Sequence, residues 1–443
     1  MSKEKPDLPL LRPMGVLERY MVARSQLGVY QKVAVTARYQ CKSTDTLKSR
    51  LYAALATVVS QHPVLSAAAV DVDSKIPCFA RLPYIDLDQV ASFNEIETLD
   101  DVDGKVPSLD RFLEQEHTRQ WDFGPALPLW RVHVFQQSGD TSRFILCYFF
   151  HHALGDTKSA LVFHEGVEAA LNTGSDVESA SRISTRTDLP LLPPLDDIPR
   201  ASASTSQSTA QEDLSGVWTG AVQSLPVQTR LRSLWLSAEQ SKRFAQQCKK
   251  NGVSVTAALQ TMLAAAIFQQ IPEGYTTLKT SCPVSLRAWL PSPVSAESIG
   301  VFVDTFPEKY HRGPFSWEEA KRAKQTIDKV MQNRCGHGLI ENLARIQDVK
   351  AEVDGNMGHP RRASLEMSNV GKLGPLQPGK DYQIESLLFS QSAGAMSAAL
   401  KVSIVTGRDG RFTLAFSWQE GVIEDGFGEK VIGEFGSILE RET

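Results

Sequence analysis

A stretch of low apolar content, residues 173–215, divides this chain of 443 residues into two parts. It is rich in Ser, Thr, Pro and Asp, and it offers too little apolar surface to offset the entropy that ordering would cost. We therefore expect a connector here. It separates an N-terminal part, residues 1–172, from a C-terminal part, residues 216–443, and each part has the size of one domain.

The composition describes a folded protein with substantial cores. Hydrophobic residues make up 42% of the chain and charged residues 22%, which excludes a disordered chain. The net charge is −4, so there is no basic excess and we expect no nucleic-acid partner. The six cysteines are far apart and form no Cys-x-x-Cys pair, which favours reduced thiols and predicts neither a disulfide framework nor a metal site.

The termini and the apolar runs give no sign of a membrane. Residues 1–15 are charged and contain prolines, without the apolar segment of a secretory signal. The longest apolar stretch, residues 264–268, is far shorter than a bilayer span. We expect a cytoplasmic protein without a transmembrane segment, and a monomer, because the two parts look self-sufficient together.

Periodicity in the N-terminal part predicts one clear helix and several strands. Apolar residues recur at helical spacing over residues 47–59; Ser43 or Thr44 can cap this helix, and Pro63 ends it. The strands are expected over residues 33–39, 129–135 and 144–150.

The C-terminal part also mixes helices and strands. Ser254 is expected to cap a helix that Pro272 stops. Strands are expected over residues 278–284, 401–406 and 411–418, with a hairpin turn between the last two and a closing helix over residues 422–439. The pattern predicts an α/β or α+β fold with two similar layers that meet across a cleft.

The most informative segment is FILCYFFHHALGDTKSALVFHEG, residues 144–166. A continuous apolar run is typical of a strand buried on both faces. The run ends at His151 and His152, and Gly155 and Asp156 follow just before an amphipathic helix. The H-x-x-x-D spacing alone carries no weight, because this composition produces it by chance; the strand, the doubled histidine and the helix give it weight.

HHALGD is similar to the H-H-x-x-x-D signature of the superfamily of chloramphenicol acetyltransferase, peptide-synthetase condensation domains and plant acyltransferases. Other segments resemble its alcohol acetyltransferase branch, and they occur in the expected order between residues 11 and 440. These segments are residues 16–20, 24–30, 61–65, 128–132, 283–287, 300–302 and 368–371.

The resemblance implies two chloramphenicol-acetyltransferase-like domains, a pseudo-symmetric pair with a tunnel at their interface. Acetyl-CoA or another short acyl-CoA would enter from one face, and a small-molecule alcohol, such as a simple alcohol or a secondary-metabolite scaffold, from the other. His152 would be the general base of O-acyl transfer. One base with a pKa near neutrality suffices because the thioester is already activated, so no metal is required.

We expect the residues next to His152 to stabilise the loop and not to take part in the reaction. In the family, the residue at Asp156 orients the histidine loop by pairing with an arginine, which Arg287 matches here; alternatively, Asp156 is a helix N-cap. We expect His151 to be structural, because neighbours at the end of a strand point in opposite directions.

Two further features bear on the chemistry. By resemblance, Ser368 and Asn369 are candidate donors to the oxyanion or the acyl group, although Asn-Val-Gly could equally make a turn. The family has Gly after the motif aspartate, whereas this chain has Thr157, for which Gly155 compensates only in part. This departure puts the efficiency, and even the reaction type, in question.

Three alternatives remain open. The acceptor could be an amine, since the same base serves N-acyl transfer. The cleft could instead promote an elimination, isomerisation or cyclisation without coenzyme A, or the protein could bind a ligand without catalysis. Coenzyme A binding separates acyl transfer from the other two, and loss of turnover in His152→Ala separates a repurposed enzyme from a binding protein.

Overall fold

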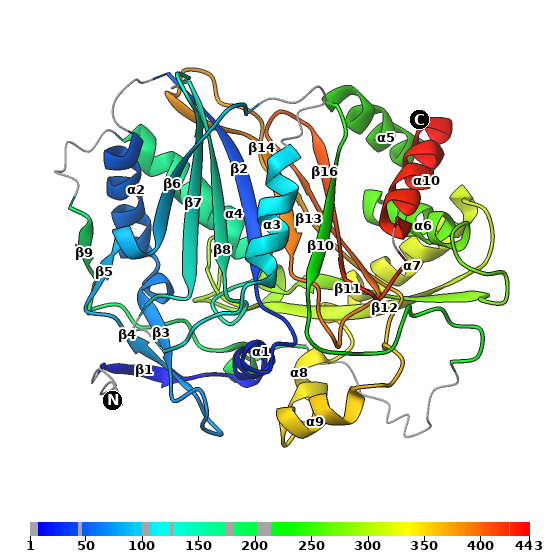
Figure 1. Ribbon diagram of the computed structural model, residues 1–443, viewed down its shortest axis with the longest axis horizontal. Helices are drawn as coiled ribbons and strands as arrows, with labels where there is room; N and C mark the ends of the chain where they lie inside the picture. The colour runs from blue at the N-terminus through cyan, green and yellow to red at the C-terminus, as the bar shows by residue number, and fades with distance from the viewer. Residues whose placement is uncertain are drawn as a thin grey trace.

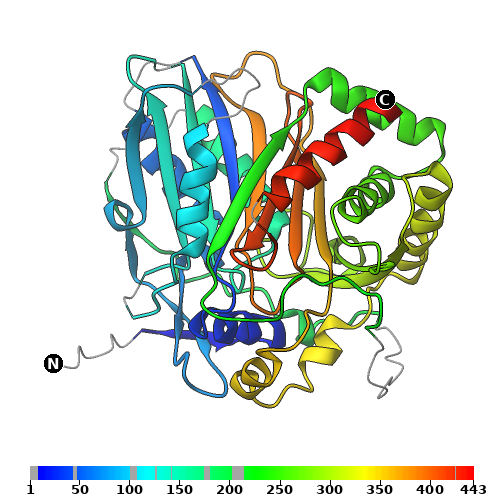
Figure 2. The same ribbon diagram turned by 45° about the vertical axis from the view of Figure 1, so that its right-hand side comes forward.

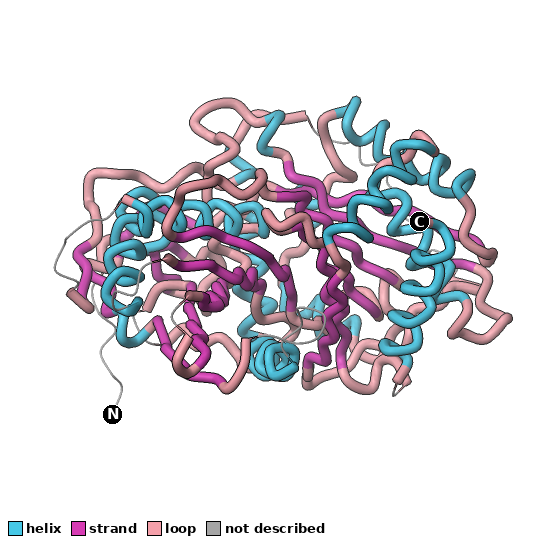
Figure 3. Tube along the Cα trace, turned by 90° about the horizontal axis from the view of Figure 1, so that it is seen from above, coloured by secondary structure: helices cyan, strands magenta, loops and turns pink. Residues whose placement is uncertain are grey.

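The structure is a computed structural model that describes residues 8–42, 47–99, 107–124, 127–140, 142–173, 180–201, 214–424 and 426–443. The expected helix caps Ser43 and Thr44 lie outside these ranges. Figure 1 shows two sheets side by side, the N-terminal part at the left and most of the C-terminal part at the right. Seen from above, the strands run through the middle of the molecule and most helices lie toward its two ends (Figure 3).

The first sheet has five strands in the order β14-β2-β8-β7-β6. Alternate residues of β8 point to opposite faces, as the strand geometry requires, and both faces are covered by apolar side chains. The long apolar run in the sequence is therefore a central strand, as predicted. The strands are β2 (Val33–Cys41), β6 (Ala91–Ile96), β7 (Trp130–Gln137), β8 (Arg143–Phe150) and β14 (Tyr382–Gln391).

Helices cover both faces of this sheet. Helices α2 (Leu47–Gln61) and α4 (Thr157–Asn172) pack together on one face, and α3 (Pro107–Thr118) lies on the other face, where it contacts β10. The predicted end of α2 at His62-Pro63 agrees with the structure, because Pro63 begins a short 3-10 helix (Pro63–Ser66) instead.

The second sheet has six strands in the order β10-β16-β15-β13-β11-β12. They are β10 (Thr229–Trp235), β11 (Thr277–Ser285), β12 (Val303–His311), β13 (Leu365–Lys372), β15 (Leu400–Thr406) and β16 (Phe412–Gln419).

Four helices accompany the second sheet, and Figure 2 shows α10 lying across it next to β10. They are α5 (Ala238–Lys250), α6 (Val255–Phe268), α7 (Trp317–Asn333) and α10 (Phe427–Glu442). Ser254 caps α6 as expected, through its side chain and the backbone N–H of Ala257. The closing helix begins at Phe427 and not at Val422, because Gly426 has a positive φ angle that a helix interior does not allow, and it serves as the N-cap instead.

The C-terminal part of the chain contributes one strand to the first sheet. Strand β14, from the C-terminal part of the chain, pairs antiparallel with β2 and completes the N-terminal sheet. Pairing satisfies the backbone groups of β2, which would otherwise form an open edge. The sheets therefore do not divide at residue 216, and the division into folding units of residues 1–172 and 216–443 stays a prediction.

The expected connector also differs from expectation over residues 180–201. There β9 (Arg182–Ser184) pairs with β5 (Tyr84–Asp86), and the side chains of Ile183, Leu195 and Ile198 are buried in the N-terminal core. The apolar residues of this section provide enough apolar surface to drive its burial. The prediction missed this because it was made from the Ser, Thr and Pro content of the whole segment.

Smaller elements lie at the bottom of Figure 1. Strands β1 (Leu10–Pro13), β4 (Cys78–Arg81) and β3 (Ala67–Val70) form a three-stranded sheet. Helix α1 (Val16–Gln26) contacts α8 (Leu339–Leu343) and α9 (Val349–Asn356), which come from the C-terminal part. These three helices lie together below the two sheets in Figure 1, and residues of all three line the cavity described next.

Two further observations concern the expectations from composition. All six cysteines lie in the described ranges, and none forms a disulfide. Within those ranges no single helix is long and apolar enough to cross a membrane; helices α5 and α6 meet such a criterion only when counted together, across a bend of 102°.

Candidate active site

A cavity of about 590 Å³ lies between the two halves of the molecule. Residues of α1, the loop after β8, strands β11, β12, β13 and β15, and helices α8 and α9 line it. This volume falls in the range of small-molecule sites, and both apolar and polar groups face it. Four of the predicted site residues line the cavity: His152, Asp156, Ser368 and Asn369. The other three do not line it: His151, Gly155 and Arg287.

His152 lies in the short loop between β8 and α4, and its ring faces the cavity. The ring centre is 6.2 Å from that of Tyr30. Nδ1 is buried and, among the described residues, meets no hydrogen-bond partner on another side chain or backbone group. Nε2 also makes no hydrogen bond within the described residues and, unlike Nδ1, it is not fully buried, so it is the ring nitrogen left to meet a ligand.

Burial is the main cause that lowers the pKa of His152 below its ordinary value of 6.5. The positive charges of Arg24 and Lys401 act in the same direction, while Asp156 opposes them. The imidazole is consequently neutral at neutral pH and can accept a proton.

His151 has the structural position that the sequence analysis expects. Its ring is buried against Trp121 and Phe123 in edge-on geometry, and its Nδ1 accepts a hydrogen bond from the backbone N–H of Ala153 at 3.1 Å. Burial, followed by the nearby His152, lowers the pKa of His151 to about 3, so this ring stays neutral. The two histidines thus face opposite sides of the loop.

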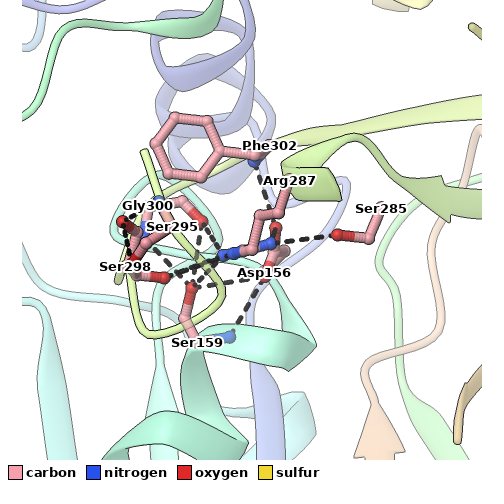
Figure 4. A network of polar contacts seen from close by, with 8 residues as sticks. All are labelled: Asp156, Ser159, Ser285, Arg287, Ser295, Ser298, Gly300 and Phe302. Carbon is pink, nitrogen blue, oxygen red and sulfur yellow. Dashed lines mark hydrogen bonds and ion pairs between the residues drawn. The ribbon is translucent and has the colours of Figure 1, made fainter. Parts of the chain in front are cut away.

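Asp156 fulfils both of its expected roles at once (Figure 4). Its Oδ1 accepts from the backbone N–H of Ser159 at 3.1 Å, which caps α4. Its Oδ2 receives Nη1 of Arg287 at 2.6 Å and the backbone N–H of Phe302 at 3.0 Å. The backbone N–H of Asp156 donates to the carbonyl of Gly300 at 3.2 Å.

Arg287 uses its remaining donors on the same loop. Nη2 donates to Ser159 Oγ at 3.0 Å and to the carbonyls of Ser298 and Gly300, each at 3.1 Å. These partners belong to the β11–β12 connection and to the first turn of α4. The network therefore fastens the histidine loop of one half to the second sheet.

The pKa of Asp156 agrees with its ion pair to Arg287. Burial would raise the pKa of Asp156, but Arg287 and the backbone N–H donors outweigh it and hold the pKa below its ordinary value of 3.8. Both side chains of the ion pair are almost fully buried. Both carboxylate oxygens are thus used on these partners, and the lowered pKa keeps the group ionised at neutral pH.

Gly155 and Thr157 flank the aspartate. A Cβ added to Gly155 would lie 2.8 Å from Cβ and Oγ of Ser159, so the close approach of the loop to α4 requires glycine. Thr157 is the first residue of α4 and lines the cavity.

Ser368 and Asn369 lie on β13 and line the cavity. The amide of Asn369 donates to Thr256 Oγ1 at 3.2 Å and accepts from the backbone N–H of Gly371 at 3.0 Å, where Gly371 has a positive φ and the pairing of β13 with β15 is irregular. Residues 369–371 thus belong to strand β13 and do not form the simple turn that was the alternative expectation, although these bonds use part of the Asn369 side chain.

The sequence analysis missed a group of charged and polar side chains at the end of the cavity near α1. Lys401 Nζ lies 3.6 Å from Glu366 Oε1, and burial lowers the pKa of Lys401 to about 8 although Glu366 opposes this change. Arg24 and Tyr30 also line this end, and the Tyr30 hydroxyl donates to Gln391 at 3.3 Å. A lysine within an otherwise apolar strand, as in ALKVSIV, is the signal that could have identified Lys401.

The described residues contain no group of three or more His, Cys, Asp or Glu side chains that could hold a metal ion.

Comparisons with known proteins identify the family to which the chain is similar. The sequence model of the alcohol acetyltransferase family matches residues 13–197 and 201–442. A curated relative from Aspergillus fumigatus, described as a probable alcohol acetyltransferase (crmB), is 32% identical over 94% of this chain and 96% of its own. Another from Fusarium pseudograminearum, described as a probable alcohol acetyltransferase (FCK4), is 24% identical over 95% of this chain and 93% of its own.

Solved structures share the fold. The TRI3 trichothecene 15-O-acetyltransferase from Fusarium sporotrichioides superposes with a TM-score of 0.71 at 12% identity, over 100% of this chain and 99% of that one. The condensation domain of the Monacolin K polyketide synthase MokA gives a TM-score of 0.64 at 12% identity, over 98% of both chains. The predicted chloramphenicol-acetyltransferase-like fold is confirmed along the whole chain.

Proposed function

Because the chain belongs to the alcohol acetyltransferase family and is an acyltransferase for alcohols, we propose that it moves an acetyl or similar short acyl group from coenzyme A to a small-molecule hydroxyl. In this proposal His152 is the general base. The acceptor ranges from a simple alcohol to a secondary-metabolite scaffold.

One observation carries the proposal. The imidazole of His152 faces a 590 Å³ cavity between the two halves, with Nδ1 buried and Nε2 open to it. A hydroxyl bound there can donate its proton to a neutral imidazole, which its lowered pKa ensures at neutral pH. A carbon–oxygen bond then forms as the carbon–sulfur bond breaks, and the proton returns from His152 to the sulfur.

The lining of the cavity fits an acyl thioester. Ser368 lines the cavity and its side chain has no hydrogen bond within the described part of the chain, so its hydroxyl is available as a donor to the developing charge on a carbonyl oxygen. Asn369 is a weaker candidate, because its amide already holds Thr256 and Gly371. The thioester supplies an acyl group that is already activated.

The test is the release of free coenzyme A thiol from acetyl-CoA in the presence of a panel of alcohols. The wild-type protein is compared with His152→Ala and with His359→Ala, whose ring is exposed and away from the cavity. We expect turnover that His152→Ala reduces by about 10²–10⁴-fold and His359→Ala leaves unchanged. Transfer to amines as well as alcohols would extend the acceptor class to N-acylation.

A different outcome would overturn the proposal. If no alcohol releases thiol and acetyl-CoA does not raise the melting temperature of the wild-type protein, acyl transfer is excluded. An elimination, isomerisation or cyclisation without coenzyme A, which the departure at Thr157 leaves open, would then be sought. The monomeric state and the cytoplasmic location stay predictions; sedimentation and fractionation test them.

A further inference from the structure

The end of the cavity near α1 holds an arginine with unused donors. Arg24 lies in the last turn of α1, and its guanidinium lines the cavity. It donates to Ser397 Oγ at 3.4 Å and to Met21 Sδ at 3.7 Å, which are long contacts. Its Nε is buried and has no hydrogen-bond partner within the described ranges. A guanidinium carries five N–H donors, so most of its capacity is unspent.

A second cation lies close by. Lys401 on β15 is 3% exposed, and its Nζ lies 4.4 Å from the ring centre of Tyr30. The Cζ of Arg24 lies 4.8 Å from the same ring centre. Tyr30 thus brings both cations to one region of the cavity.

The charges that line the cavity do not balance at this end. Each carboxylate has a cationic partner: Asp156 has Arg287, Glu366 has Lys401, and Glu352 has Arg362. Two cations that line the cavity, Arg24 and Lys158, have no carboxylate at ion-pair distance within the described part of the chain, and Arg24 is the one that shares the ring of Tyr30 with Lys401. A cation that is partly buried without a counter-charge is costly, and a bound anion would remove that cost.

We propose that Arg24, supported by Lys401, binds a carboxylate of the acceptor, so that the preferred substrates are hydroxy acids. This inference rests on the proposed function. The two carboxylate oxygens match the paired N–H donors of a guanidinium, and Ser397 offers a hydroxyl beside them.

The distance from His152 separates this anion site from the phosphates of coenzyme A. Arg24 Cζ and the His152 ring centre lie 4.8 Å and 6.2 Å from the Tyr30 ring centre, so they are at most about 11 Å apart. The phosphates of coenzyme A are separated from its sulfur by the whole pantetheine arm. A group this close to the base meets the acceptor or the acyl group instead.

The experiment compares hydroxy acids with their methyl esters. The pairs are 6-hydroxyhexanoate and 4-(hydroxymethyl)benzoate, each beside its ester, with acetyl-CoA as donor. We expect kcat/KM for the acid to exceed that for the ester by about tenfold or more, because the ester cannot make the charge-assisted hydrogen bonds. In Arg24→Gln this ratio should fall toward one, and in Lys401→Met it should fall in part.

A matched control and a second donor define the alternatives. Arg19→Gln changes an arginine on the same helix that does not line the cavity, and the ratio should not change. A ratio near one in the wild-type protein, or an equal ratio in Arg24→Gln, overturns the inference. A preference for succinyl-CoA over acetyl-CoA that Arg24→Gln abolishes also overturns it, since the anion then belongs to the acyl group.

A binding measurement tests the anion site independently of acetyl transfer. If no acceptor is acetylated, the proposed function fails, and calorimetry with 4-(hydroxymethyl)benzoate decides the anion site by itself. Binding that weakens about tenfold or more in Arg24→Gln but not in Arg19→Gln supports the site, given the strength of charge-assisted contacts. Equal binding by all three proteins overturns it.

Discussion

Arg287 Nη1 lies 2.6 Å from Asp156 Oδ2, although 131 positions separate the two residues in the chain. The contact joins the N-cap of α4 to the connection between β11 and β12. It holds the loop that carries His152 against the second sheet, so the orientation of the imidazole depends on both halves of the molecule.

Removing one partner of this pair should destabilise the protein strongly. Arg287→Met leaves a buried carboxylate without its counter-charge, and we expect a loss of about 3–5 kcal/mol in the free energy of unfolding. Chemical denaturation measures this loss. Arg243→Met is the control, because the side chains of Arg243 and its partner Glu239 are 47% and 78% exposed and surface pairs contribute little. Equal effects of the two substitutions would contradict the role given to Arg287.

Asp156 should also make stability depend on pH at the acidic end. Its pKa in the folded protein is below the ordinary value of 3.8, so its contribution is fully present above that value and is lost as the pH falls through the folded pKa. The difference in unfolding free energy between the wild type and Asp156→Asn should therefore be constant from pH 7 to about pH 5 and shrink below it. A difference that grows on acidification would contradict this assignment.

The sequence predicted the elements that local patterns determine. The apolar run before His151 predicted β8, because a central strand buries both faces; Ser254 and Pro63 predicted a helix start and a helix end. The order of the family motifs predicted the fold, which the comparisons confirm.

Contacts between residues far apart in the chain could not be predicted from local sequence patterns. Nothing local in residues 382–391 indicates that β14 joins the sheet of the N-terminal part, since its partner β2 lies some 350 positions away. The same holds for Arg24 and Lys401, which meet only because α1 and β15 line one cavity. The Asp156–Arg287 pair was found from sequence because the resemblance supplied it; spacing alone could not.

The activity of the proposed base should follow the pKa of His152. This pKa is lowered below 6.5, so kcat/KM should be constant near pH 7 and should fall on acidification through a pKa below 6.5. His152→Ala should reduce kcat/KM by about 10²–10⁴-fold and remove this acidic limb. A limb that persists in the residual activity of His152→Ala would show that another group titrates.

The close approach of the histidine loop to α4 gives the last prediction. Gly155→Ala places a Cβ 2.8 Å from Ser159 Cβ and Oγ, closer than carbon and oxygen atoms normally pack. We expect a loss of about 1–3 kcal/mol in unfolding free energy, as overpacking typically costs. Activity should fall as well, because His152 belongs to the displaced loop. Gly433→Ala on α10 is the control, since its added Cβ meets no atom within 4 Å and should stabilise the helix.

The double substitution Gly155→Ala with Ser159→Gly isolates the clash. Ser159→Gly alone costs stability, because Ser159 Oγ links Asp156, Arg287 and Gly300. If the steric conflict is the cause, the loss in the double variant is smaller than the sum of the two single losses, with a coupling of about 0.5–3 kcal/mol. Additive losses would contradict the steric explanation, because the backbone conformation of Gly155 has no positive φ and does not itself require glycine.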